Sequence, residues 1–307
     1  MLINLKGLAT EERNPRTKDL DTMSPLQLAK AMNDEDGRTV QAVRAVLPQV
    51  AQAIKMATEA LACGGRIIYL GAGTSGRLGV LDASECPPTF GVPAGKVVGL
   101  IAGGYSALIN AAEGAEDSTT EAREQLEQIG ACPSDVVIGI AASGRTPYVV
   151  YGLRHAHMQG ISTVAIADVA DSKIGKEADL AIEMLPGPEV LTGSTRLKAG
   201  TTQKLVLNMI STGAMVGVGK AYQNLMVDMV QSNEKLRSRV ASIVMEATGC
   251  DVDAAQGALE ATGGKAKAAI VMILCRCGAQ EAQRLLKQAQ GHVRKAIKLG
   301  GYGKDAD

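Results

Sequence analysis

Two short segments rich in glycine and hydroxyl side chains carry the residue types best suited to chemistry. Gly71–Arg77 (GAGTSGR) and Ala142–Pro147 (ASGRTP) each follow an apolar run that predicts a strand, and each leads into a predicted helix. Backbone N–H groups at the start of a helix, together with serine and threonine hydroxyls, bind phosphate groups. We therefore expect both segments to hold the phosphate of one small molecule. The candidate binding residues are Gly73, Thr74, Ser75, Ser143, Gly144, Arg145 and Thr146.

Two other interpretations of the first segment fit the sequence less well. Gly71–Gly76 matches the letters of the dinucleotide fingerprint G-x-G-x-x-G, which also requires an acidic residue after the second strand to bind the ribose. Here the second predicted strand runs into 102–104 (AGG), and Pro87 and Pro88 predict a short helix after the first segment. We therefore expect no NAD(P). The absence of G-x-x-x-x-G-K-[ST] argues in the same way against a nucleoside triphosphate loop.

An ordinary capped helix remains an alternative for the second segment. Thr146 suits the N-cap position and Pro147 suits the first helical turn. Capping alone explains less easily why two such segments follow neighbouring strands. Arg77 and Arg145 could neutralise a phosphate or carboxylate, or form surface or interface ion pairs, and the sequence leaves both roles open.

Charge and composition restrict the class of ligand. The 307 residues include 32 Lys and Arg against 32 Asp and Glu, so no net charge attracts nucleic acid or an anionic membrane. Six Tyr, one Phe and no Trp leave few rings for base stacking. Six Cys and three His show no zinc spacing, so we expect no metal. Residues 1–7 form no apolar signal core and no apolar run spans a membrane, which predicts a cytoplasmic protein.

A sheet must place the two segments side by side. Short apolar runs predict five strands, at 66–70, 96–101, 135–141, 162–167 and 180–184, with helices between them. Nearly continuous apolar strands that alternate with helices indicate an α/β fold with a doubly wound parallel sheet covered on both faces. Ligands bind such sheets beyond the carboxyl ends of the strands.

Three regions are expected along the chain. Residues 1–38 are polar and rich in turn signals, which predicts an N-terminal arm with turns and short helices. Residues 39–232 contain an amphipathic helix at 39–63, the five strands and a long helix at about 198–219. Residues 233–307 show helical segments separated by glycine, which predicts a small all-helical C-terminal domain.

The two glycine segments resemble those of sugar isomerase (SIS) domains, which bind phosphosugars. The chain further resembles the N-acetylmuramic acid 6-phosphate etherase family within Thr10–Asp21, Gly71–Pro88, Ala112–Asp117 and Leu191–Gly200. The similarity extends over nearly the whole chain, and glucokinase regulatory proteins share part of the pattern. The resemblance implies that residues 39–232 form a SIS-type phosphosugar-binding domain. Because SIS domains commonly pair, it also implies a homodimer with its site near the interface.

The resemblance implies a carbon–oxygen lyase of cell-wall recycling that needs no cofactor. Such an enzyme eliminates D-lactate from N-acetylmuramic acid 6-phosphate and then adds water, which gives N-acetylglucosamine 6-phosphate. Two carboxyl groups suffice for this chemistry. One removes the weakly acidic proton on carbon 2 of the open-chain sugar, and the other protonates the ether oxygen so that lactate can leave.

Carried over residue by residue, the resemblance assigns Glu85 as the proton donor to lactate and Glu116 as the second acid/base, which we take to be the base at carbon 2. The apolar residues around Glu85 predict a desolvated carboxyl group with a raised pKa. Asp82, Glu113 and Asp117 are nearby acids that could take either role.

Two functions of other kinds stay open from the sequence. One is a phosphosugar-binding regulator that does not convert its ligand, and the other is an aldose–ketose phosphosugar isomerase. The two acids and the single SIS domain argue against a regulator of the glucokinase kind, which carries two such domains. An isomerase would use a base at carbon 2 but would need no acid for a leaving group.

Overall fold

The computed structural model describes residues 10–110, 112–230 and 234–301, and the chain divides into two compact units. The first comprises the described residues of Met1–Ser84 and Gly95–Ser211, and the second those of Glu85–Ala94 and Thr212–Asp307. The domain boundary expected between residues 232 and 233 lies outside the described residues and stays a prediction.

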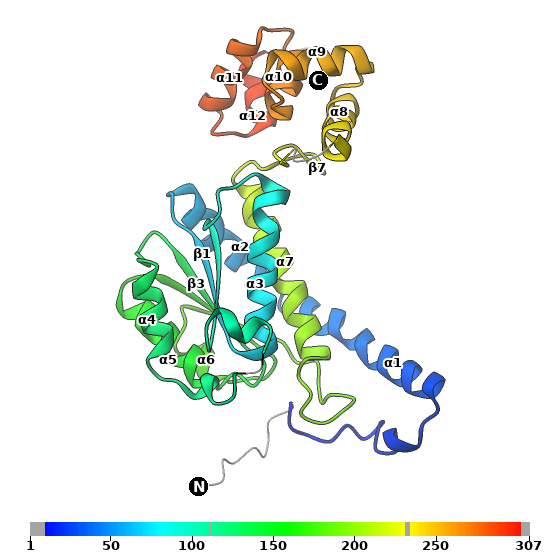
Figure 1. Cartoon of the computed structure of the whole chain (residues 1–307), viewed down its shortest axis with the longest axis vertical. Coiled ribbons are helices and arrows are strands. Elements are labelled where there is room, and N and C mark those ends of the chain that lie inside the picture. Colours follow the sequence, from blue (N-terminus) through cyan, green and yellow to red (C-terminus); the bar gives the residue numbers. More distant parts are fainter. Residues whose placement is uncertain (1–9, 111, 231–233, 302–307) are drawn as a thin grey trace. The chain divides into compact units, whose positions relative to one another are not determined.

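A five-stranded parallel sheet forms the centre of the first unit, in the order β2-β1-β3-β4-β5 (Figure 1). Its strands are β1 (Ile67–Gly71), β2 (Val97–Ile101), β3 (Val136–Ala141), β4 (Ser162–Ala167) and β5 (Leu180–Glu183). The α/β class and the five parallel strands expected from the sequence are confirmed. β1 pairs with both β2 and β3, so the strand order reverses beside β1. Ligands bind open sheets at the carboxyl edge near such a reversal.

Helices cover both faces of this sheet, with α4 and α5 on one face and α2, α3 and α7 on the other (Figure 1). The helices are α1 (Pro25–Arg44), α2 (Leu47–Ala62), α3 (Gly73–Phe90), α4 (Glu121–Gln128), α5 (Pro147–Met158), α6 (Lys173–Lys176) and α7 (Lys198–Gly217). Successive side chains of β1 point to opposite faces. Ile68 and Leu70 pack in the cluster that includes Leu153 of α5, whereas Tyr69 meets α3. A Cβ at Gly79 would lie 2.9 Å from the Cβ of Tyr69, so glycine lets α3 approach the sheet closely.

The N-terminal helices differ from the sequence expectation. Instead of one helix at 39–63, the structure has α1 and α2, and α1 begins inside the region expected to be an arm. Ser24 starts α1 with a capping box that includes Gln27. Pro48 lies in the first turn of α2, where its missing N–H is not needed, but a proline there disfavours one continuous helix.

The helix after the first glycine segment is also longer than expected. α3 continues from Gly73 to Phe90 with Pro87 and Pro88 inside it. Each proline lacks the N–H that would donate to the carbonyl four residues earlier, so the helix loses two hydrogen bonds but continues, and the Gly91 N–H donates to the Pro87 carbonyl at 2.9 Å. The expectation of a short helix is therefore wrong. The residues directly after β2 are Ala102, Gly103 and Gly104, so the acidic residue that the dinucleotide fingerprint requires there is missing.

The described part of the second unit contains a small antiparallel hairpin followed by helices. The elements are β6 (Ala221–Tyr222), β7 (Leu225–Met226), α8 (Glu234–Thr248), α9 (Val252–Ala261), α10 (Ala266–Leu274), α11 (Ala279–Gln288) and α12 (Val293–Leu299). Ala269, Ile270 and Val271 of α10 are completely buried and contribute to the core of this unit. The helical C-terminal region expected from the sequence is confirmed. Across the described residues, no helix combines the length and hydrophobicity that a membrane span requires.

A buried group of charges attaches the N-terminal segment to α7. Lys198 is completely buried, and its Nζ donates to Glu35 Oε2 at 2.6 Å and to the Pro188 carbonyl at 2.7 Å. Arg16 forms a second ion pair with Glu35. Burial alone would raise the pKa of Glu35, but the hydrogen bonds from Lys198 and Arg16 hold it below its ordinary value. The group therefore joins the N-terminal segment, α1 and the loop before α7 through one ionised carboxylate.

We expect Lys198→Met to lower the free energy of unfolding by about 3–5 kcal/mol, because it removes the main partner of a buried carboxylate. Urea denaturation followed by circular dichroism measures this loss. Lys55→Met is the matched control, since Lys55 and Glu59 form an exposed pair at 3.8 Å. That variant should change stability by less than about 1 kcal/mol. Equal effects of the two changes would contradict the structural role of the buried group.

Candidate functional site

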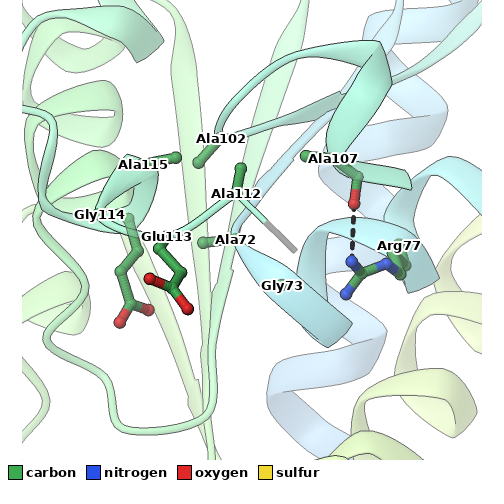
Figure 2. Close-up of a pocket in the computed structure, with 10 residues that line it drawn as sticks. Ala72, Gly73, Arg77, Ala102, Ala107, Ala112, Glu113, Gly114 and Ala115 are labelled. Carbon is green, nitrogen blue, oxygen red and sulfur yellow. Dashed lines mark hydrogen bonds between the residues drawn. The ribbon is translucent and has the colours of Figure 1, made fainter. Parts of the chain in front are cut away.

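A cavity of about 310 Å³ lies beside the amino terminus of α3 (Figure 2). The chain segments that follow β1 and β2 form it, and most of its lining residues are glycine or alanine. Small side chains leave room for a ligand. The charged groups that line it are Arg77, Glu113 and Glu116. The cavity therefore combines a cation and two carboxylates at the carboxyl edge of the sheet.

Glycines fix the sharp passage from β1 into α3. A Cβ at Gly71 would lie 2.6 Å from the backbone nitrogen of Gly76, and a Cβ at Gly76 would lie 2.6 Å from the carbonyl oxygen of Gly71. Larger residues at either position would force the strand and helix apart. Gly73, by contrast, has a positive φ of 52° and open space around its missing Cβ. Gly71 and Gly76 thus shape the turn, whereas Gly73 leaves the backbone exposed to the cavity.

The guanidinium group of Arg77 is held at the cavity by backbone carbonyls. Its Nε donates to Leu108 at 3.0 Å and its Nη2 donates to Ala107 at 2.7 Å. Figure 2 shows the contact with Ala107, with Glu113 on the other side of Gly73. Neutral carbonyl acceptors fix the position of the guanidinium but leave its positive charge available to an anion.

Glu116 lies in the cavity, as does Glu113, one of the acids left as an alternative. Glu116 belongs to the short 3-10 helix η3 (Ala115–Asp117), which begins after Gly114 in the left-handed conformation at φ 76°. That backbone angle favours glycine, so Gly114 allows the chain to turn both glutamates into the same cavity. Asp117 is the next residue of η3 and does not line the cavity.

Asp82, a third alternative acid, is buried in a network of hydrogen bonds. Its carboxylate accepts from the Tyr69 hydroxyl at 2.8 Å, from Asn208 Nδ2 at 2.7 Å and from the Ser211 hydroxyl at 3.1 Å. Burial raises the pKa of Asp82, although these three donors act in the opposite direction. The contacts join β1, α3 and α7, which is a structural use of the carboxyl group.

Glu85 does not line the cavity. It comes twelve residues after Gly73 in α3, which corresponds to about 18 Å of helix at the usual rise per residue. Of the two predicted catalytic glutamates, Glu116 is therefore the one among the residues that line the cavity. Glu85 is also exposed, so the expectation that neighbouring residues desolvate it is wrong for the single chain. The catalytic roles of both residues stay predictions.

The second glycine segment follows β3, directly beside β1, as the sequence predicts. Gly144 has a φ of 64°, and a Cβ there would lie 2.5 Å from the Cβ of Ser172, so this position requires glycine. Thr146 is the N-cap residue of α5 and Pro147 its first residue, but the Thr146 side chain makes no capping hydrogen bond. Capping therefore does not account for the Thr146 hydroxyl. The binding roles of this segment stay predictions, as do those of Gly73, Thr74 and Ser75.

Hydrogen bonds connect the two glycine segments through residues that the sequence analysis missed. The Ser75 hydroxyl donates to Gln203 Oε1 at 2.9 Å, and Gln203 Nε2 donates to Asp168 Oδ2 at 2.8 Å. The backbone N–H of Asp168 in turn donates to the carbonyl of Ala142 at 3.1 Å. Asp168 directly follows β4, so a polar residue at the carboxyl end of a buried strand was the available signal. Burial raises the pKa of Asp168 to about 8, with a further contribution from the charge of Glu189.

This raised pKa predicts a pH-dependent stability. Between about pH 4 and pH 8 the folded chain keeps a proton on Asp168 that the unfolded chain has released, so stability falls as pH rises. The contribution of this group is roughly 1.4 kcal/mol per pH unit, and Asp168→Asn removes it. Urea denaturation between about pH 5 and pH 8 should therefore show that the free energy of unfolding of the variant increases relative to that of the wild type as pH rises. A difference that stays constant with pH would contradict a neutral Asp168.

Among the described residues, no group of three or more His, Cys, Asp or Glu side chains is arranged to hold a metal ion.

Family models match the part of the chain that forms the sheet. The model of the glucokinase regulatory protein N-terminal SIS domain matches residues 49–157, and the SIS domain model matches residues 120–213.

Curated relatives match nearly the whole chain. N-acetylmuramic acid 6-phosphate etherase of Pectobacterium atrosepticum is 54% identical over 299 residues, which covers 97% of this chain and 98% of the relative. The protein of the same name from Mycolicibacterium smegmatis is 53% identical, with 97% of this chain and 100% of the relative covered. Among solved structures, phosphoheptose isomerase from Francisella tularensis is 15% identical with a TM-score of 0.49, covering 63% of this chain and 100% of that chain.

Proposed function

The chain belongs to the N-acetylmuramic acid 6-phosphate etherase family, and from this membership we infer that it cleaves the lactyl ether of N-acetylmuramic acid 6-phosphate. The observation that carries the inference is the sequence identity of 54% and 53% to these two relatives, which extends over nearly the full length of this chain and of each relative. The enzyme is a carbon–oxygen lyase. Elimination releases D-lactate, and hydration of the unsaturated sugar gives N-acetylglucosamine 6-phosphate. This reaction belongs to cell-wall recycling, and the charged phosphosugar substrate supports a cytoplasmic location.

In this proposal Glu116 is the base that removes the proton from carbon 2 of the open-chain sugar. The electrons of that C–H bond form the double bond between carbons 2 and 3, and the bond from carbon 3 to the lactyl oxygen breaks. Glu85 donates the proton that the departing oxygen needs. Hydration runs through the same groups in reverse. The position of Glu116 in the cavity, with the fixed charge of Arg77 nearby, supports its assignment.

The two glycine segments bind the 6-phosphate in this proposal. Their neighbouring strands support it, as do the exposed backbone at Gly73 and the Thr146 hydroxyl that capping does not use. Phosphate binding of this kind depends on backbone N–H groups and neutral hydroxyls, so it requires no cluster of lysines.

We further propose that the active enzyme is a homodimer in which the partner copy supplies Glu85 to the cavity that contains Glu116. The roughly 18 Å of helix between Gly73 and Glu85 supports this arrangement. Leu81 lies one turn before Glu85, on the same face of α3, and is 52% exposed. A second copy packed on this face would cover Leu81 and desolvate Glu85. Such packing would also supply the apolar surroundings that the sequence predicts for Glu85.

Isotope labelling tests the reaction. The protein is incubated with N-acetylmuramic acid 6-phosphate in H₂¹⁸O, and lactate and sugar are followed by mass spectrometry. The etherase predicts D-lactate release with ¹⁸O at carbon 3 of the sugar. In elimination, lactate keeps the ether oxygen. ¹⁸O in lactate would instead show that the bond between the ether oxygen and the lactyl carbon is cleaved, which contradicts elimination. A regulator would bind without releasing lactate, and an isomerase would convert the sugar without releasing lactate.

A further inference from the structure

We propose that Asp168 and Gln203 are positioning residues that reverse a chain of hydrogen bonds so that Ser75 can donate to the bound phosphate. The inference rests on the proposed function for the identity of the ligand. The single hydroxyl hydrogen of Ser75 is donated to Gln203 Oε1 at 2.9 Å. A phosphate oxygen only accepts hydrogen bonds. Ser75 must therefore release Gln203 before it can bind phosphate.

The contacts of Thr202 bear on whether the Asp168 carboxyl group, within this series of hydrogen bonds, carries a proton. Its Oγ1 lies 2.5 Å from Asp168 Oδ1 and 2.7 Å from the carbonyl oxygen of Ala199. A threonine hydroxyl has one hydrogen, and a carbonyl oxygen can only accept. The Lys198 carbonyl oxygen lies 3.2 Å from the same hydroxyl. We take Thr202 to donate to Ala199, its nearer carbonyl, and the contact with Asp168 is then a hydrogen bond that a protonated Asp168 donates to Thr202. The complete burial of Asp168, which disfavours its charged form, is consistent with this assignment.

A neutral Asp168 allows the whole chain to reverse without moving its heavy atoms far. When Ser75 turns its hydrogen to the phosphate, the Gln203 amide flips so that Nε2 donates to the Ser75 oxygen. Gln203 Oε1 then faces Asp168. The Asp168 carboxyl group rotates by half a turn, which exchanges its two oxygens, so that its O–H donates to Gln203 Oε1 and its other oxygen accepts from the Thr202 hydroxyl. The hydroxyl hydrogens of Ser75, Thr202 and Asp168 and one amide hydrogen of Gln203 each have an acceptor in both directions. An ionised Asp168 would instead oppose the oxygen of Gln203, so loss of its proton blocks the reversed state.

The same carboxyl residue also fixes the second glycine segment. The backbone N–H of Asp168 donates to Ala142 at 3.1 Å, at the start of the segment that contains Ser143. The side chain of Asp168 connects to Ser75 through Gln203, and the backbone N–H of Asp168 contacts Ala142 directly. One buried residue therefore sets both halves of the phosphate site, and changes in the chain should act on binding of the phosphate rather than of the sugar.

Binding measurements on three variants test the proposal. Titration calorimetry compares N-acetylglucosamine 6-phosphate with N-acetylglucosamine, so the result does not depend on catalysis. Gln203→Met keeps the size of the side chain but removes both hydrogen bonds, and we expect at least about tenfold weaker binding of the phosphosugar. Asp168→Asn should bind within about threefold of wild type, because its amide can donate or accept on either side. Gln128→Met, the same change at an exposed position of α4, is the matched control and should bind as wild type does.

Kinetics and pH provide readouts that a purely structural role would not move. Gln203→Met should raise KM for the phosphorylated substrate more than it lowers kcat. Wild-type affinity should fall above about pH 8, where Asp168 ionises beside Glu189, while Asp168→Asn should show no such fall. Wild-type affinity in Gln203→Met, or an equal loss in Asp168→Asn, would overturn the proposal.

The experiments also cover a variant that fails to fold and a protein that binds the phosphosugar without cleaving it. If Gln203→Met does not melt cooperatively, Gln203→Glu replaces it. A glutamate there accepts from Ser75 but cannot donate to it in the reversed state, so we again expect at least about tenfold weaker phosphosugar binding. Unchanged affinity would overturn the proposal. Wild-type protein that binds the phosphosugar but releases no lactate would refute the proposed reaction and leave the hydrogen-bond chain to be decided by the same titrations.

Discussion

Replacement of Glu116 by glutamine is expected to lower the rate of lactate release by about 10²–10⁴-fold, because the amide cannot accept the proton of carbon 2. The loss should appear in kcat, since the side chain keeps its size and its place in the cavity. Exchange of the carbon-2 proton with D₂O, followed by NMR, should stop as well. Lactate release is measured with a coupled D-lactate dehydrogenase assay.

Glu113→Gln is the matched control, because Glu113 lines the same cavity and undergoes the same chemical change. We expect it to keep exchange and most of the activity. A loss of exchange in Glu113→Gln with none in Glu116→Gln would transfer the role of base to Glu113. Glu85→Gln should stop lactate release but still exchange the carbon-2 proton. The opposite pattern, with exchange lost at Glu85 and kept at Glu116, would reverse the two assignments.

The strands and the glycine segments could be predicted because their signals are local. Each strand is a short apolar run, β1 and β3 are buried along their whole length, and each glycine segment directly follows one of these two strands. The two glycine segments lie at the same edge of the sheet because β1 and β3 are neighbouring parallel strands. The C-terminal helices were equally accessible, because glycine separates them in the sequence.

Predictions failed where a local signal was weighed without its position in an element. Proline disfavours helices in general, yet α3 continues through Pro87 and Pro88 to Phe90, so the two missing N–H donors affect only its last turn. Pro48 had the opposite effect, since it separates α2 from α1 within a run whose apolar period predicted one helix. For residues 39–63 the apolar period correctly indicated helix, and the position of Pro48 decided where the second helix begins.

Long-range pairs of polar residues could not be obtained from the sequence. Gln203 and Asp168 are 35 residues apart, and Ser75 and Gln203 are 128 apart. No spacing rule connects such residues, because the sheet and α7 bring them together only in the folded chain. The same limit applies to the two catalytic candidates. Glu85 follows the first glycine segment closely in the sequence, yet the rise of α3 carries it well away from Gly73.

Mixing two inactive variants is expected to restore activity if the partner copy supplies Glu85. In a symmetric dimer of one Glu85→Gln chain and one Glu116→Gln chain, one site receives both native glutamates and the other receives neither. Random exchange of subunits should therefore give about a quarter of the wild-type rate per chain, and a heterodimer purified through two different tags about half. Each variant alone should stay near background. Size-exclusion chromatography verifies that the mixed species is a dimer.

A second mixture sharpens the test, because it predicts a loss rather than a gain. A heterodimer of wild type with the double variant Glu85→Gln/Glu116→Gln has no intact shared site, since each cavity combines one native and one changed glutamate. It should therefore be nearly inactive. Sites that lie within one chain predict the reverse in both experiments: no recovery from the two single variants, and about half of the activity in the heterodimer with wild type. The two mixtures together decide whether the glutamates meet across the interface, because a general defect in folding or pairing would lower both rather than raise one.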